Sequence, residues 1–302
     1  NSLNNNSGNI SGLRIFHIGI LLLAAAPSIS FLLLIISSII GSTNRKDNYF
    51  KDKYNFPFLL ATLLMVINCI LITIKADIIY NQSTSLAWIG LLNWIPFFWC
   101  FWSFQIYLKN EILRIQASKY FLIGSLPVLF SGFTQYFLGW YGPYEIFNKL
   151  IIWYQRPLSE GAGVTSLFNN YNYCGAWLSI VLALIIGLFF KEAHHKSLKS
   201  IILILIFAFI YMIILTTSRN ALLAVLITLI LLIPIKKFKF LIISFFATLG
   251  VLLIKLIPIF PSNIKDFLFI FIPSSLLSKT GLNPINELSS FPRIDLWLRS
   301  IE

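Results

Sequence analysis

The stretch IILILIFAFIYMIILTTSRNALLAVLITLILLIPI, residues 201–235, is apolar except for the short polar tip TTSRN at 216–220. At about 1.5 Å of rise per residue, the helix on either side of this tip would be no longer than the hydrocarbon of a membrane is thick, roughly 30 Å. The stretch therefore predicts a hairpin of two membrane-spanning helices, 201–217 and 220–235, with Arg219 at its outer end.

The composition of the whole chain supports an integral membrane protein. Apolar residues make up 58% of the 302 residues, charged residues only 11%, and the mean hydropathy is +0.82. The apolar runs lack period-2 alternation, which favours helices over a barrel. We therefore predict an all-α polytopic bundle in residues 1–260, with an outer loop at 141–172 and, at 261–302, the start of a large outer loop that the sequence leaves incomplete. The eight predicted spans are 15–40, 56–74, 86–108, 120–140, 173–190, 201–217, 220–235 and 240–260.

The lysines and arginines indicate which loops face the cytoplasm, because short cytoplasmic loops collect them. Thirteen fall in the loops 41–55, 109–119, 191–200 and 236–239. The opposite loops hold five, Arg14, Lys75, Lys149, Arg156 and Arg219. We therefore expect both ends of the sequence to face outward. We attribute the net charge of +12 to the basic cytoplasmic loops and to attraction of anionic membrane lipids. A nucleic-acid partner would need a soluble basic domain, and this sequence has none, so we exclude such a partner.

Arg219 has two interpretations at the end of its hairpin. The first is that its long side chain reaches the lipid headgroups and only anchors the hairpin. The second is that it binds a ligand, because the neighbouring Thr216, Thr217, Ser218 and Asn220 supply hydrogen-bonding groups and a guanidinium can grip a phosphate with two parallel hydrogen bonds.

Other polar residues give weaker signals. The three cysteines lie in or at the edge of predicted spans, and the three histidines are scattered, so we predict neither a disulfide framework nor a metal site. The segment FPRIDLWLRS, residues 291–300, predicts an amphipathic helix at the membrane surface. Arg293 lies beside its apolar stripe, either as a ligand-binding cation or as a solvated charge.

The stretches TTSRNALLAVL at 216–226, GAGVTSLFNNYNYCGAWL at 161–178 and FPRIDLWLRS at 291–300 are three motifs to consider together. They resemble motifs of the O-antigen ligase and polymerase superfamily of membrane glycosyltransferases. The stretch TTSRNALLAVL looks like the family's SRxA hairpin, and GAGVTSLFNNYNYCGAWL is similar to its N-P-N motif before the next span, with Asn170 and Asn172 at the asparagine positions and Tyr171 in place of proline. The segment FPRIDLWLRS resembles the arginine-x-x-x-tryptophan helix of the family's large periplasmic loop. The resemblance extends from residue 161 to the end of the sequence.

This resemblance implies a bacterial inner-membrane enzyme of lipopolysaccharide or polysaccharide biosynthesis that works on the periplasmic face. Its donor would be a glycan on undecaprenyl pyrophosphate, and its acceptor the lipid A core or another glycan chain. It implies catalytic roles for Arg219 and Arg293, substrate contacts by Asn170, Asn172 and Ser218, no metal or other cofactor, and a catalytic histidine beyond Glu302. The alternative from a different class is a transporter of a small anion, in which Arg219 and Lys255 would line a pore.

Overall fold

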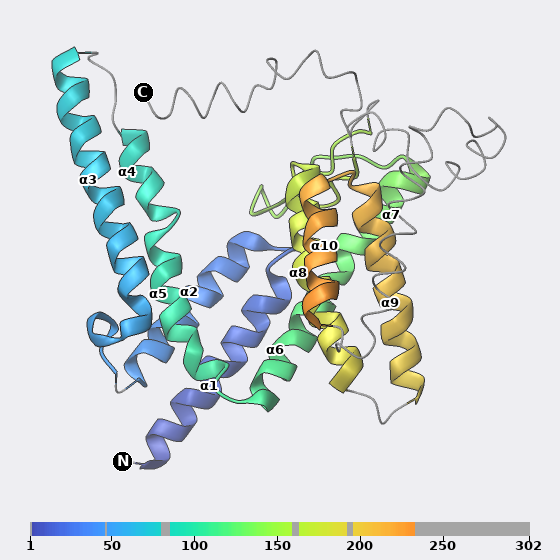
Figure 1. The fold of residues 1–302 in the computed structure, drawn as a ribbon, viewed down its shortest axis with the longest axis horizontal. Helices are drawn as coiled ribbons and strands as arrows, with labels where there is room; N and C mark the ends of the chain where they lie inside the picture. Colours follow the sequence, from blue (N-terminus) through green and yellow to red (C-terminus); the bar gives the residue numbers. More distant parts are fainter. Residues whose placement is uncertain (1, 46, 80–84, 159–162, 192–195, 233–302) are drawn as a thin grey trace.

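The computed structural model describes residues 2–45, 47–79, 85–158, 163–191 and 196–232, and these are mostly helical (Figure 1). The α-helices are α1 Ser2–Leu22, α2 Pro27–Thr43, α3 Phe56–Ile79, α4 Ser85–Leu92, α5 Ile95–Phe104, α6 Glu111–Gly124, α7 Leu126–Leu138, α8 Tyr171–Lys191, α9 Lys196–Leu215 and α10 Arg219–Leu232. The 3-10 helices are η1 Tyr49–Lys51, η2 Lys53–Asn55 and η3 Gln105–Tyr107, and the strands are β1 Tyr144–Ile146 and β2 Ile151–Trp153.

The described helices confirm a mostly helical protein suited to a membrane. Five helical segments are long and apolar enough to cross one: Lys53–Ile74, Ser85–Tyr107, Glu111–Leu138, Tyr171–Lys191 and Ser197–Leu215. The predicted count of eight spans is not confirmed. The span predicted at 220–235 is described as far as Leu232, over the 14 residues of α10, and the one predicted at 240–260 lies outside the described residues.

The prediction of one span at 15–40 is wrong, because this run is two helices joined by a turn at residues 23–26. Pro27 begins α2, where its missing N–H costs no helical hydrogen bond. The two helices then run antiparallel in close contact. The Ser30 hydroxyl donates to the Gly19 carbonyl at 2.7 Å, and a Cβ at Gly19 would come within 2.8 Å of the Leu34 side chain. Hydropathy alone could not separate the two helices, since both are apolar.

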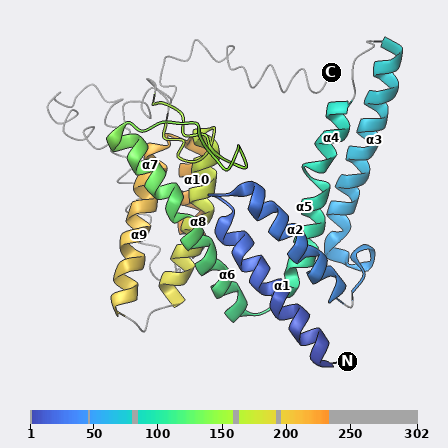
Figure 2. The same cartoon turned by 180° about the vertical axis from the view of Figure 1, so that it is seen from behind.

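The α1–α2 hairpin also changes the placement of the N-terminus. Figures 1 and 2 show the N-terminus at the end of the molecule where α2 ends, α6 begins and α8 ends at Lys191. We call this the basic end. We call the opposite end, with residues 139–158 and 163–170 and the tip between α9 and α10, the loop end. The start of α1 therefore lies at the same end of the molecule as the end of α2 and the start of α6, rather than at the opposite end, where the charge pattern led us to expect it.

Two other predicted boundaries are corrected. Residues 109–119 are not a loop: Asn110 caps α6 by accepting the Leu113 amide at 2.9 Å, and the helix begins at Glu111. The predicted span at 120–140 is therefore the upper part of a longer segment, which breaks at Ser125 between α6 and α7. The span predicted at 86–108 is similarly broken between α4 and α5, where Pro96 lies in the first turn of the second helix.

The core is organised around α8, which packs against α6, α9 and α10 (Figures 1 and 2). Leu178, Val181 and Ile185 of α8 are fully buried, as are Phe209 and Met212 of α9. One side of α8 is buried among these helices, while Tyr173 and Ile180 on the other side are exposed, so close packing on the buried side fixes the position of the helix. The N-terminus of α8 therefore has a fixed position at the loop end.

Candidate functional site

The polar tip between α9 and α10 is largely buried, apart from Arg219 and Asn220, which are exposed. Thr216, Thr217 and Ser218 have exposed fractions of 0%, 3% and 1%. Thr217 has φ +53°, a left-handed conformation that is rare for a β-branched residue and costs on the order of 1 kcal/mol or more. Such backbone strain persists only where the surroundings impose it, and it concentrates at functional sites.

Asn170 and Asn172 join the start of α8 to this tip. The Asn170 side-chain oxygen accepts the Asn172 amide at 2.7 Å, so Asn170 caps α8. Asn172 has a different role: its side-chain oxygen accepts the Ser218 hydroxyl at 2.9 Å. Ser218 precedes α10, and its hydroxyl also lies 3.4 Å from the Ala221 amide as a helix cap. One hydrogen bond therefore holds the N-termini of α8 and α10 together.

This junction is strongly electropositive. Each helix N-terminus carries roughly half a positive charge from its aligned peptide dipoles and its unpaired N–H groups. Neither α8 nor α10 has an acidic residue in its first turn, where one would be stabilising. Arg219, the first residue of α10, adds a full positive charge, and its side chain is exposed. The arrangement raises the positive potential at one point and favours a bound anion.

Residues 154–158 and 163–167, which we call the strap, fix the tip from the other side. The Val164 amide donates to the Leu215 carbonyl at 3.0 Å, at the end of α9. A Cβ at Gly163 would overlap the Thr216 carbonyl oxygen, so only glycine allows the strap to approach this closely. The strap and the tip therefore form one packed unit.

Gln135 of α7 anchors the strap and is only 1% exposed. Its amide nitrogen donates to the Arg156 carbonyl at 2.5 Å, and its oxygen accepts the Thr165 and Ser166 amides at 3.1 and 2.8 Å. Sequence reasoning missed this residue. The available signal was an amide side chain inside an apolar predicted span, since polar groups there are costly and usually functional or structural.

A groove of about 650 Å³ runs down between α8 and α10 from the electropositive junction. Its upper end holds the polar side chains of Asn172 and Asn220. Further down, the lining residues are mostly small or aliphatic: Ala176, Ser179, Ile180, Ala183, Leu184, Ala221, Ala224 and Thr228. The groove is therefore polar beside Arg219 and apolar along the helices.

The structure brings together three of the five predicted site residues, Asn172, Ser218 and Arg219, and places Asn170 beside them. Arg293, the second predicted catalytic arginine, lies outside the described residues, as does Lys255. Within the described part of the chain, no three His, Cys, Asp or Glu side chains are grouped so that they could hold a metal ion.

In comparisons with models of protein families, with curated proteins and with solved structures, nothing matches this chain.

Proposed function

We propose that this chain is a membrane glycosyltransferase that moves a glycan from a lipid pyrophosphate, with Arg219 as a binding residue for the pyrophosphate. The observation that carries the proposal is the junction of two helix N-termini, joined by the Ser218–Asn172 hydrogen bond, with Arg219 in the first turn of α10. A positive charge at a helix N-terminus opposes the helix dipole. A bound anion removes that conflict.

The groove between α8 and α10 supports a lipid-linked anion rather than a small soluble one. The polar groups of Asn172 and Asn220 lie at one end, and the small and aliphatic residues of two apolar helices follow. Apolar helix surfaces in a membrane accommodate a hydrocarbon chain as readily as they accommodate lipid tails. A polyprenyl pyrophosphate matches both parts, with its charged group at Arg219 and its chain along the groove.

The proposed reaction depends on stabilising the negative charge of the pyrophosphate leaving group. The acceptor hydroxyl oxygen bonds to the anomeric carbon of the donor sugar, the bond from that carbon to the pyrophosphate oxygen breaks, and the electron pair leaves with the pyrophosphate. The hydroxyl proton passes to a base. Arg219 and the two helix N-termini would stabilise the negative charge that develops on the leaving group. The resemblance of the sequence motifs suggests Arg293 as a second cation.

The same resemblance supplies the biological setting of the proposal. The donor would be carried by undecaprenyl pyrophosphate on the periplasmic face of the bacterial inner membrane, and the acceptor would be the lipid A core or a growing glycan. The energy for transfer is already stored in the donor's pyrophosphate bond, so a reaction on this face calls for no nucleotide.

The test uses Arg219→Lys and Arg219→Ala in the full-length protein, with glycan transfer from a radiolabelled lipid-linked donor normalised to folded protein. Lysine keeps the charge but loses the planar, two-pronged grip on a phosphate, so transfer should fall at least about tenfold, and further in the alanine variant. Arg156→Ala is the matched control, because this exposed arginine of the strap uses only its backbone to bond Gln135. It should transfer normally.

Three outcomes would reject the proposal. Near-normal transfer by Arg219→Lys would mean that the residue only anchors its hairpin. An equal loss in Arg156→Ala would indicate general attraction of an anion to the loop end rather than a specific grip. Uptake of a small anion into vesicles, with no transfer by the unaltered protein, would favour the transporter.

A further inference from the structure

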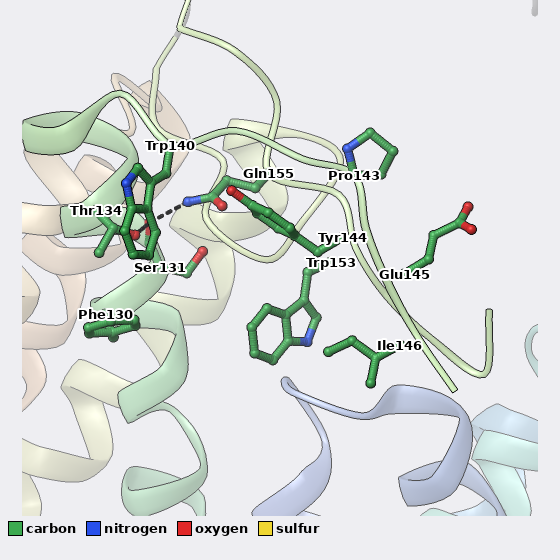
Figure 3. A pocket seen from close by; sticks show the side chains of 10 residues that line it. All are labelled: Phe130, Ser131, Thr134, Trp140, Pro143, Tyr144, Glu145, Ile146, Trp153 and Gln155. Atoms are coloured by element: carbon green, nitrogen blue, oxygen red, sulfur yellow. Dashed lines mark hydrogen bonds between the residues drawn. The ribbon is translucent and has the colours of Figure 1, made fainter. Parts of the chain in front are cut away.

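A second cavity lies at the loop end, on the side of α7 that faces the β1–β2 hairpin. It has a volume of about 640 Å³ and is formed by α7, β1, β2 and the segments beside them (Figure 3). Tyr144 lies opposite Trp153 on the neighbouring strand, so the two rings lie on the same face of the β1–β2 hairpin. The lining residues are Phe130, Ser131, Thr134, Trp140, Pro143, Tyr144, Glu145, Ile146, Trp153 and Gln155.

Four aromatic rings make up much of this wall, those of Phe130, Trp140, Tyr144 and Trp153 (Figure 3). Trp153 is held in a fixed orientation, because its indole N–H donates to the Ala25 carbonyl in the α1–α2 turn at 2.7 Å. Rigid aromatic rings offer large apolar faces at little entropic cost. A pyranose ring has a matching apolar face, formed by its axial C–H groups, and hydroxyl groups around its edge.

The polar groups of the cavity suit a ligand with hydroxyls. Thr134 and Gln155 both donate to the Ser131 carbonyl, at 3.0 and 2.7 Å. The Ser131 hydroxyl, on a side chain that is part of the wall, is buried and has no hydrogen-bond partner. Burial of an unpaired hydroxyl costs about 1–3 kcal/mol. Rotation about a single side-chain bond would let this hydroxyl pair with a ligand group.

The cavity is also close to neutral. Glu145 is the one charged residue among those that line it, and Figure 3 shows its carboxylate at the rim, pointing away from the rings. Its charge is partly balanced by Lys149 at 3.8 Å. A phosphate or another anion would find no cation in the wall, so the cavity favours an uncharged ligand.

We propose that this cavity binds a neutral pyranose ring of a glycan. The inference about the ligand stands on the rings, on the unpaired Ser131 hydroxyl and on the neutral wall. Its link to catalysis rests on the proposed function, since Gln135 follows Thr134 on α7 and anchors the strap that holds the tip beside Arg219. The sugar would belong either to the lipid-linked donor or to the acceptor chain.

The experiment measures binding of the purified full-length protein to an array of defined oligosaccharides, followed by titration of the glycans that it retains. The unaltered protein should bind a subset of neutral glycans. Trp140→Ala and Tyr144→Ala should weaken that binding at least about tenfold, because each removes an apolar platform. Trp94→Ala is the control, since Trp94 is exposed to a similar degree, 58% against 49% for Trp140, but lies between α4 and α5.

Ser131→Ala separates a binding role from a structural one. It should weaken glycan binding about fivefold through the loss of one hydrogen bond, while the melting temperature stays the same or rises, because the hydroxyl has no partner in the folded chain. Retention of no glycan by the unaltered protein, equal losses in Trp94→Ala, or full binding by Ser131→Ala and Trp140→Ala would each overturn the proposal.

Trp140→Ala also identifies the source of the sugar. If the cavity holds the donor glycan, this variant should weaken binding of the lipid-linked glycan. If the cavity holds the acceptor, Trp140→Ala should leave binding of the lipid-linked glycan unchanged and weaken binding of the free acceptor glycan. Failure of the proposed function would give a different result. Arg219→Lys would then transfer glycan normally, while the cavity still bound glycan.

Discussion

At the scale of single residues, Asn172 offers a way to change the charge of the junction without changing its structure. Asn172→Asp keeps an oxygen that can accept the Ser218 hydroxyl, and a negative charge in the first turn of α8 should raise stability by about 0.3–1 kcal/mol. The same charge opposes a bound phosphate. Two unit charges near 4 Å interact by about 1–4 kcal/mol at a partly exposed site, so donor affinity should fall about tenfold or more. Thermal unfolding and donor titration measure the two effects.

The matched control for this charge change is Asn148→Asp. Asn148 is exposed in the turn between β1 and β2 and has φ +51°, a conformation that aspartate tolerates. The variant adds the same negative charge to the loop end, away from the helix N-termini. Unchanged donor affinity in Asn172→Asp, or an equal loss in both variants, would remove the basis for an anion site at the junction.

The candidate site was predictable in part from the residues alone. An arginine in an apolar hairpin and two asparagines before a span are visible in the sequence, because charged and amide groups are costly in a membrane. The Ser218–Asn172 bond and the anchoring by Gln135 were not predictable, since they join residues 46 and about 30 positions apart. The burial of the threonines at the tip also depends on the strap, which no local pattern in the sequence reveals.

At the scale of the helices, two glycines of α8 test how closely this helix must approach α10. A Cβ at Gly175 would lie 2.8 Å from the Ala221 Cβ and 2.9 Å from the Ser218 Cβ, whereas a Cβ at Gly187 would meet nothing within 4 Å. Gly175→Ala should therefore destabilise the protein by about 1–3 kcal/mol and move the junction apart. Gly187→Ala, in the same helix, should stabilise it by about 0.5–1 kcal/mol.

Thermal unfolding in nanodiscs and glycan transfer would show both effects. We expect a lower melting temperature and reduced transfer for Gly175→Ala, and an equal or higher melting temperature with normal transfer for Gly187→Ala. If the two variants behave alike, the close contact between α8 and α10 is not needed to hold Asn172 beside Ser218.

The existence of most helices could be predicted from the sequence, and their interruptions could not. Continuous hydropathy marks α3, α8 and α9 well, because each fills one apolar run. The breaks before Pro27, Pro96 and Pro127 were missed, although proline in a first helical turn is an available signal. The β1–β2 hairpin was also missed, since each strand has three residues and no clear alternation.

At the scale of the whole molecule, contacts between residues far apart in the sequence hold the α1–α2 hairpin in place. The indole of Trp153 reaches the α1–α2 turn, and a Cβ at Gly124 would overlap the Leu21 carbonyl oxygen. The first hairpin therefore ends against α6 and beneath the β1–β2 hairpin, inside the molecule rather than at its surface (Figures 1 and 2). Because α1 and α2 run antiparallel, the chain is back at the basic end by residue 44. The start of α1 therefore lies at the basic end as well.

The last prediction tests whether the start of α1 lies on the same side of the membrane as the rest of the basic end. Single cysteines are introduced at Ser2, Ser197 and Tyr141 in the full-length protein, where the native Cys69, Cys100 and Cys174 are buried. Ser2 begins α1 and Ser197 lies near the start of α9, both at the basic end, while Tyr141 is 61% exposed at the loop end. Because lysine and arginine collect on the cytoplasmic side, an impermeant thiol reagent applied to whole cells should label only Tyr141→Cys. Ser2→Cys and Ser197→Cys should react after permeabilisation. Labelling of Ser2→Cys together with Tyr141→Cys in intact cells would mean that residues 15–40 cross the membrane once, and the α1–α2 hairpin could not then support Trp153 and the aromatic cavity above it.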